Sequence, residues 1–128
     1  MHNIQANSRD NVVAIQIALG GKNGVATMDI DVDPAFGCAV LASGADPAGG
    51  KAVSVAMRML DEVWLEKDAP LISLIKIDVE GGESQVLAGA MKMIRQCKPI
   101  ILIEATSVAQ LQDIEARLSP IGYAYNQP

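Results

Sequence analysis

Aromatic residues, histidine and cysteine are all scarce in this 128-residue chain. It has one tryptophan, two tyrosines and one phenylalanine, so we expect a core built from aliphatic side chains and methionine. His2 is the single histidine, which argues against a Ser-His-Asp triad or a histidine-based metal site within one chain. Cys38 and Cys97 have neither CxxC nor metal-type spacing, and we expect them to be reduced thiols.

The sequence also has no excess of positive charge and no long apolar run. Ten basic and 15 acidic residues give a formal net charge of −5, which argues against a nucleic-acid or anionic-membrane partner. No apolar run approaches the roughly 20 residues of a membrane span. Residues 1–7 lack the basic and then apolar pattern of a secretory signal. We therefore predict one cytoplasmic domain over residues 1–128.

The first half of the chain predicts strands and turns. Val12–Leu19 is rich in β-branched residues and predicts a mostly buried strand. Val25–Asp33 alternates apolar and polar residues, which predicts a half-solvated strand, antiparallel to its neighbour. We expect further short elements, namely strands over Ala39–Ala42 and Val53–Met59 and a short helix over Leu60–Leu65.

The second half has the pattern of a strand–helix–strand unit. Ile72–Val79 and Ile100–Glu104 are nearly continuous apolar runs, which predict fully buried parallel strands. Between them, Glu83–Cys97 has apolar residues at helical spacing and predicts one amphipathic helix. Right-handed βαβ packing and a parallel sheet follow from this order.

The last residues predict a capped helix. Ser107 and Gln110 have the spacing of a capping box, and the apolar pattern after them extends to about Leu118. A final strand is expected to begin over Tyr123–Tyr125.

Carboxylates follow both buried strands and form a predicted acidic rim. Lys76, Asp78 and Glu80 alternate along the first strand and share a face, and Glu104 ends the second strand. Since adjacent parallel strands end side by side, we expect Asp78, Glu80 and Glu104 to lie together, with Glu83 at the helix entry. Lys76, roughly 6.6 Å from Asp78 along the strand, would favour an ionised Asp78.

Plainer roles exist for the same residues. Glu83 can act as a helix cap favoured by the helix dipole, and Lys76 can simply neutralise Asp78. A third interpretation, Mg²⁺ bound by the rim, has no specific spacing in its favour. The acids Asp29, Asp31 and Asp33 belong to a solvated strand face, so we predict no metal site.

The run Lys76-Ile77-Asp78-Val79-Glu80-Gly81-Gly82-Glu83 resembles the Lys-Ile-Asp-Val-Glu-Gly-x-Glu signature of the FkbM family of S-adenosylmethionine-dependent methyltransferases. The likeness is strongest from Ser73 to Ala105 and weaker around Ala18-Leu19. It implies an α/β, partial Rossmann-like methyltransferase fold with a mostly parallel sheet, flanking helices and an antiparallel strand addition.

The resemblance also implies a reaction, which is methyl transfer from S-adenosylmethionine to a hydroxyl of a sugar or another small molecule. The chemistry is an in-line displacement at a sulfonium methyl and depends mainly on positioning. The implied roles are catalysis for Asp78 and Lys76, acceptor binding for Glu80, Glu83 and Glu104, and donor binding for Ala18, Leu19 and Asp78.

Part of the family pattern has no counterpart in this chain, namely the first strand, its glycine-rich turn and the acid that ends the second strand. The alternative function is therefore a non-catalytic remnant of the fold that acts in binding or oligomerisation. Ile72–Val79 would then be an exposed apolar edge, which proteins normally cover or pair. We expect a homo-oligomer formed through that edge, or direct pairing of Val12–Ala18 with Ile72–Val79.

Overall fold

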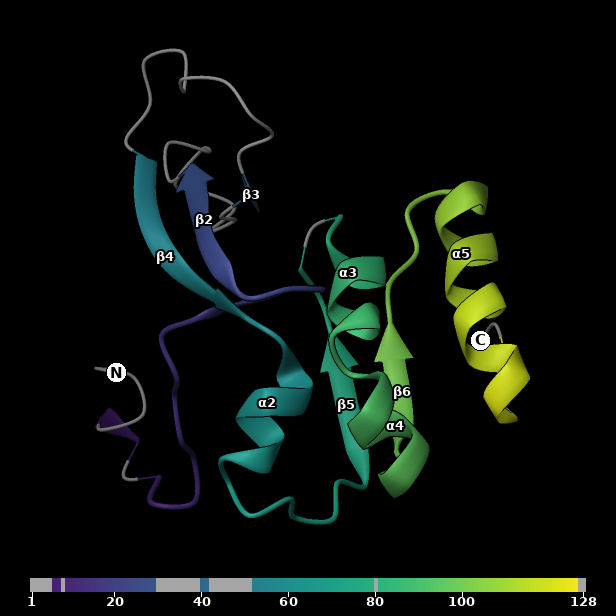
Figure 1. Ribbon diagram of the computed structural model, residues 1–128, viewed down its shortest axis with the longest axis horizontal. Helices are drawn as coiled ribbons and strands as arrows, with labels where there is room; N and C mark the ends of the chain where they lie inside the picture. The colour runs from purple at the N-terminus through teal and green to yellow at the C-terminus, as the bar shows by residue number, and fades with distance from the viewer. Residues whose placement is uncertain (1–5, 8, 30–39, 42–51, 80, 127–128) are drawn as a thin grey trace.

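The computed structural model describes residues 6–7, 9–29, 40–41, 52–79 and 81–126, and it has a mixed α/β architecture. A four-stranded sheet has the order β1-β4-β2-β3, and a separate two-stranded sheet pairs β5 with β6 (Figure 1). The strands are β1 (Ala18–Leu19), β2 (Gly24–Asp29), β3 (Val40–Leu41), β4 (Ala52–Arg58), β5 (Leu74–Ile77) and β6 (Ile100–Ile103). The helices are α2 (Leu60–Leu65), α3 (Glu83–Ala88), α4 (Met91–Cys97) and α5 (Val108–Leu118), followed by the 3₁₀ turn η1 (Ser119–Ile121).

The single, mostly parallel sheet predicted from the sequence is not present among these residues, because the strands divide between two sheets. None of the helices among the described residues could span a lipid bilayer.

The four-stranded sheet is built on the antiparallel pairing of β2 with β4, which runs the whole length of β2. β2 alternates as expected for a half-solvated strand: Ala26 is buried and Met28 half-buried, while Val25 and Thr27 are exposed. β3 pairs antiparallel with β2. The antiparallel addition is thus confirmed, and the predicted continuation over residues 30–33 lies outside the described residues.

The predicted buried strand over Val12–Leu19 is wrong for most of its length. β1 comprises only Ala18 and Leu19, which pair in parallel with the end of β4. Val12, Val13 and Ile15 are 46%, 76% and 48% exposed, because no strand of the described chain lies beside them. Pairing of this segment with Ile72–Val79 is therefore also wrong, and self-association through that edge stays a prediction.

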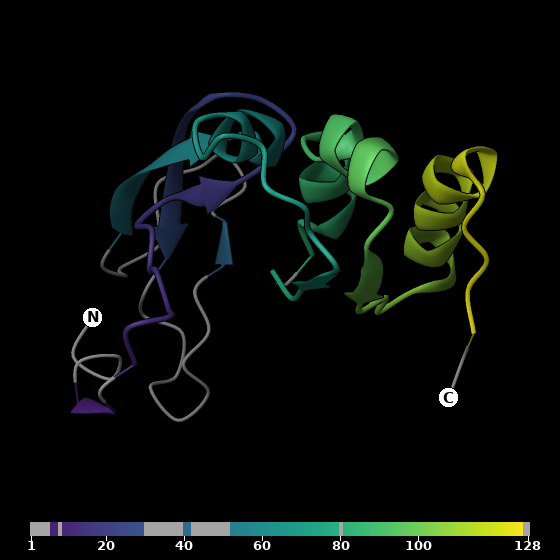
Figure 2. The same ribbon diagram turned by 90° about the horizontal axis from the view of Figure 1, so that it is seen from below.

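β5 and β6 confirm the predicted parallel pair, with Leu74 opposite Ile100 and Ile77 opposite Ile103. The prediction of full burial is wrong. The helices lie on one side of this sheet (Figure 2), and Ile77 on that side is 3% exposed. Leu74, Ile100 and Leu102 alternate onto the other face and are more than half exposed. One apolar face of the sheet is therefore open.

The predicted single helix over Glu83–Cys97 is two helices, α3 and α4, which meet at Gly89. A Cβ atom added at Gly89 would lie 2.1 Å from the carbonyl oxygen of Gly20, at the end of β1. The helix is therefore interrupted where the backbone of the four-stranded sheet packs directly against it.

Asp61 of α2 also contacts the point where α3 and α4 meet. Its backbone N–H donates to the carbonyl oxygen of Gly89 at 2.8 Å. Its carboxylate, buried at 9% exposure, accepts from the backbone N–H groups of Lys92 at 3.0 Å and Met93 at 2.8 Å. Asp61 thus caps the start of α4 from 31 residues away, and helps to hold α4 at its angle to α3.

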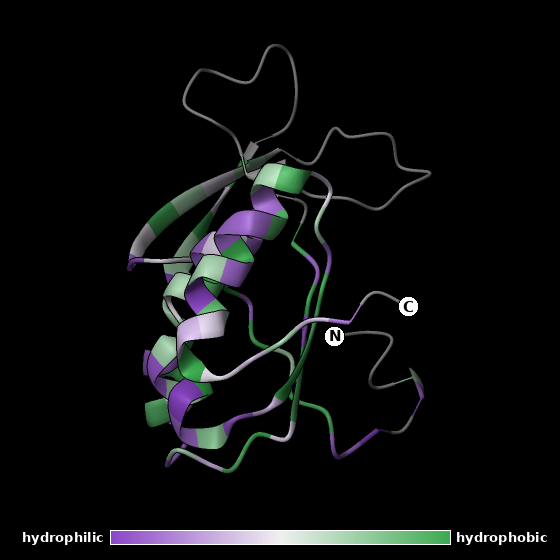
Figure 3. Ribbon diagram, turned by 90° about the vertical axis from the view of Figure 1, so that its right-hand side faces the viewer, coloured by the Kyte–Doolittle hydropathy of each residue, from purple (hydrophilic) through white to green (hydrophobic). Residues whose placement is uncertain are grey.

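The hydrophobic core lies between α2, α3, α4, α5 and the covered face of β5. Helix α5 begins as predicted, since Ser107 Oγ accepts from the backbone N–H of Gln110 at 3.2 Å. Figure 3 shows that hydrophilic and hydrophobic residues alternate along α5. The last strand predicted at residues 123–125 does not form, and this segment is held by the Tyr123 hydroxyl donating to the carbonyl oxygen of Pro99 at 2.8 Å. The core consists of Trp64, Ile77, Val86, Leu87, Ala90, Met93, Ile94, Ile114 and Leu118.

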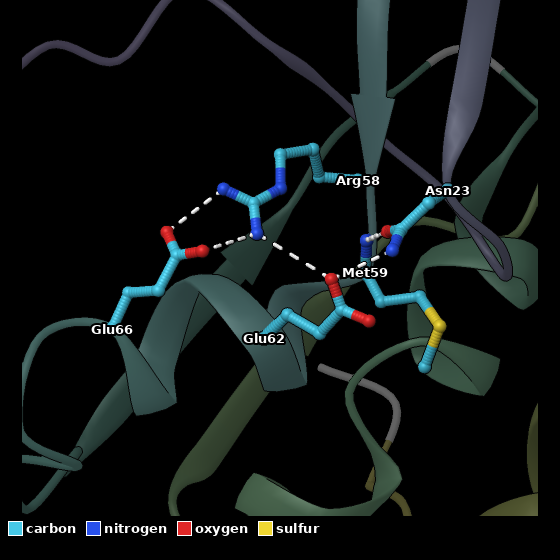
Figure 4. A network of polar contacts seen from close by, with 5 residues as sticks. All are labelled: Asn23, Arg58, Met59, Glu62 and Glu66. Carbon is cyan, nitrogen blue, oxygen red and sulfur yellow. Dashed lines mark hydrogen bonds and ion pairs between the residues drawn. The ribbon is translucent and has the colours of Figure 1, made fainter.

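A polar network joins the turn before β2 to the end of β4 and to α2 (Figure 4). The Arg58 guanidinium contacts Glu66 at 2.6 and 2.8 Å and Glu62 at 3.4 Å. The side-chain amide of Asn23 donates to Glu62 at 2.7 Å, and its oxygen accepts from the backbone N–H of Met59 at 3.1 Å. The network orients α2 relative to the four-stranded sheet.

Candidate functional site

Two acids of the predicted rim, Asp78 and Glu104, lie at the carboxyl ends of β5 and β6. Asp78 and Glu104 each follow one member of the last strand pair, Ile77 opposite Ile103. Both acids line a cleft of about 1270 Å³ that extends from these strand ends along α5. The parallel register therefore brings the two acids to one site, as the sequence predicted.

Lys76 and Asp78 form an ion pair, with 2.6 Å between Nζ and Oδ2. The side chains are 67% and 43% exposed, so both remain accessible from solvent. The hydrogen bond to Asp78, together with its negative charge and that of Glu104, raises the pKa of Lys76 above its usual value. The ammonium group is therefore protonated at neutral pH and donates a hydrogen bond to Asp78 Oδ2.

Glu83 lies beneath the rim and not in the lining of the cleft. It is 3% exposed, and its Oε1 accepts from the backbone N–H of Gly81 at 3.1 Å. Its Oε2 accepts from the side-chain amide of Gln110. Glu83 therefore holds the turn before α3 and does not cap the helix, whose N-terminus has no side-chain cap. Direct acceptor binding by Glu83 stays a prediction. Glu80 lies outside the described residues.

The walls of the cleft combine polar and apolar groups. Thr106 and Ser107 line it beside Glu104, and the apolar side of α5 lines it further along, as does the C-terminal segment with Tyr123 and Tyr125. A molecule in the cleft would meet carboxylates and hydroxyls at one end and aliphatic and aromatic side chains at the other. This suits a small organic molecule with a polar reacting end.

Ala18 and Leu19 lie apart from this cleft. They form β1 of the four-stranded sheet, and Leu19 is half-buried against the edge of the core. The structure thus brings Lys76, Asp78 and Glu104 together and leaves Ala18 and Leu19, two of the predicted donor-binding residues, at a second location.

Sequence reasoning missed several residues around the cleft, above all Thr106 and Gln110. The capping-box spacing did mark Gln110, although only as a helix-starting residue. Its side-chain oxygen in fact accepts from Thr106, from the backbone N–H at 2.8 Å and from the hydroxyl at 3.1 Å. Tyr123 and Tyr125 had no signal beyond their aromatic character.

The arrangement can do acid–base and electrostatic chemistry. A carboxylate held by an ammonium group can orient a hydroxyl or accept its proton, and the second carboxylate adds negative charge beside it. No group of three or more His, Cys, Asp or Glu within the described ranges is placed to hold a metal ion, so the Mg²⁺ interpretation gains no support there.

Comparison with known proteins gives one finding. The family model for the methyltransferase FkbM domain matches residues 3–125, nearly the whole chain. No curated protein and no solved structure matches the chain.

Proposed function

Because this chain belongs to the methyltransferase FkbM domain family, we propose that it transfers a methyl group from S-adenosylmethionine to a hydroxyl of a sugar or another small molecule. The observation that carries this proposal is the pairing of Asp78 with Lys76 at the mouth of a cleft that Glu104 shares. The cleft opens at the carboxyl ends of parallel strands, where open α/β proteins bind their ligands.

The residues present at the rim fit the reacting end of the donor. S-adenosylmethionine supplies an electrophilic methyl group on a sulfonium cation, and the carboxylates of Asp78 and Glu104 favour a positive charge beside them. Donor binding at Ala18 and Leu19 is a separate part of the proposal, since these residues do not line the cleft.

Asp78 is the proposed catalytic residue. Its carboxylate hydrogen-bonds the acceptor hydroxyl and takes its proton as the oxygen attacks, so that an O–CH₃ bond forms while the S–CH₃ bond breaks. Lys76 orients Asp78 through the 2.6 Å contact. The products are the methyl ether, S-adenosylhomocysteine and a proton held by Asp78.

The test measures donor binding and methyl transfer on the same chain. Calorimetric titration with S-adenosylmethionine and S-adenosylhomocysteine should give saturable heats. Transfer of a labelled methyl group to a panel of monosaccharides and simple alcohols should be lowered on the order of 10²-fold by Asp78→Asn, because the base is lost. Asp113→Asn is the matched control, since Asp113 pairs with Arg117 at 2.9 Å and does not line the cleft.

Two results would contradict the proposal in different ways. Absence of any binding heat at millimolar donor, from a chain shown to be folded, would favour a non-catalytic role. Unchanged transfer by Asp78→Asn would remove Asp78 from the mechanism and leave the family activity standing.

A further inference from the structure

The loops that follow β5 and β6 are joined by a chain of side-chain hydrogen bonds centred on a buried carboxylate. On the β5 side, the Gly81 backbone N–H donates to Glu83 Oε1 at 3.1 Å. On the β6 side, Thr106 donates from its N–H and its hydroxyl to Gln110 Oε1 at 2.8 and 3.1 Å. Gln110 Nε2 donates to Glu83 Oε2 and closes the chain between the two loops.

This chain of hydrogen bonds requires an amide at position 110. The Glu83 carboxylate only accepts hydrogen bonds, and the Thr106 N–H only donates, so the bridging side chain must donate on one side and accept on the other. Glutamine does both, and its orientation is fixed by its two neighbours. A buried carboxylate without such a partner is strongly disfavoured, which makes the Gln110 contact important to Glu83, itself 3% exposed.

The two loops carry the rim acids. Asp78 precedes Gly81 by three residues, and Glu104 precedes Thr106 by two. Asp78, Glu104 and Thr106 line the same cleft, whereas Gln110 and Glu83 lie behind it. This link, which Glu83 and Gln110 form between the two loops, can therefore affect the cleft by positioning its loops, and not by touching a ligand.

We propose that Gln110, through Glu83, is a positioning residue that locks the β5 and β6 loops together and so fixes the placement of Asp78 relative to Glu104. Its meaning for catalysis rests on the proposed methyl transfer, but the link itself is a property of the folded chain. A displacement of about 1 Å between reacting groups can cost on the order of 10²-fold in rate, so a link of this kind matters for an in-line reaction.

Four variants test the link. Gln110→Met keeps the length of the side chain and removes both polar groups. Gln110→Glu keeps an acceptor for Thr106 but places two carboxylates together, and Glu83→Gln places two amides together. The double exchange of Glu83→Gln with Gln110→Glu restores one carboxylate and one amide in swapped positions. The amide at position 83 can then accept from Gly81 and donate to the carboxylate at position 110. Gln112→Met on the exposed side of the same helix is the matched control.

The first readout needs no activity. In ¹H–¹⁵N spectra, Gln110→Met should move the amide signals of Gly81, Asp78 and Glu104, on both loops, while Gln112→Met should leave them in place. The double exchange should return these signals towards their original positions. Gln110→Glu should lose stability as the pH rises above about 4.3, because the folded state then holds two adjacent charged carboxylates and the unfolded state does not. The double exchange should lack this pH dependence.

The second readout is methyl transfer. Gln110→Met should lower kcat/KM for the acceptor by about tenfold or more and leave the affinity for S-adenosylmethionine within about twofold, with recovery in the double exchange. An undisturbed Gly81 amide in Gln110→Met, or a double exchange no better than either single variant, would overturn the link. Failure of the proposed function is seen separately. In that case the unaltered chain binds no donor, while Gln110→Met still shifts the amide signals of Gly81 and Thr106.

Discussion

The two sheets of this molecule differ in how they bury apolar side chains. The β5–β6 sheet has helices on one face, and the core cluster gathers there with Leu87 and Ile94 at 0% exposure. Of the side chains described in the four-stranded sheet, Ala26 is the one buried hydrophobic residue, while Val25 is 73% exposed. The length of a strand ladder is thus a poor guide to its contribution to stability. Among the described strands, β2 and β4 form the longest ladder and bury little apolar side-chain area.

This difference predicts that most of the stability comes from the helical region, and a matched pair of valines tests it. Val86→Ala in α3, where the side chain is 2% exposed, should lower the free energy of unfolding by about 2 kcal/mol or more. Val25→Ala in β2 should cost less than about 1 kcal/mol, since little apolar area leaves the protein interior. Urea denaturation of the two variants measures both values. Equal losses would mean that the four-stranded sheet contributes as much as the core cluster.

The same contrast explains what could be predicted from the sequence. β5, β6 and α5 were predictable because their apolar periodicity and the Ser107 cap are local signals that the packing also obeys. The apolar segment that begins at Val12 has the same kind of local signal, but most of it forms no strand, because a strand also needs a neighbouring strand to pair with. The single helix predicted over Glu83–Cys97 fails at Gly89, where contact with Gly20 interrupts the local pattern.

At the candidate site, some contacts likewise follow from local sequence patterns and others do not. The contact between Lys76 and Asp78 follows from the alternation of one strand, and the meeting of Asp78 with Glu104 follows from parallel pairing. The cap formed by Asp61 and the link made by Gln110 join residues 31 and 27 positions apart in the sequence. Such contacts depend on how helices pack, which no local pattern records.

Asp61 connects the two regions, and its removal should show whether they unfold together. Asp61→Ala leaves the N–H groups of Lys92 and Met93 without their acceptor and should cost about 1–2 kcal/mol. Amide hydrogen exchange should then rise at the start of α4, which loses its cap, and in β4, which leads directly into α2. Asp113→Ala serves as the control, because its carboxylate pairs with Arg117 at the surface. Exchange that rises in α4 alone would show that the four-stranded sheet is held independently of this cap.

The smallest expected effects come from surface ion pairs, and each region provides one. Arg58 lowers the pKa of Glu66 below its ordinary 4.5, mainly through its hydrogen bond, and Arg117 likewise lowers that of Asp113 below 3.8. A depressed carboxyl pKa contributes stability that is complete above the unfolded-state value and is lost as the pH falls through the folded-state value.

We therefore expect the stability difference between the unaltered chain and Arg58→Met to be constant from pH 7 to about 5, and to disappear as the pH falls below about 4.5. The corresponding difference for Arg117→Met should persist to a lower pH, because the ordinary pKa of Asp113 is lower. Both differences should shrink in high salt, since the groups face solvent. Urea denaturation from pH 7 to 3 at two salt concentrations measures them. The Arg58 difference should be the larger, since its guanidinium contacts two glutamates that fix α2 against the four-stranded sheet. If Arg117→Met costs more, the helical region depends on its surface charges as well as on its core.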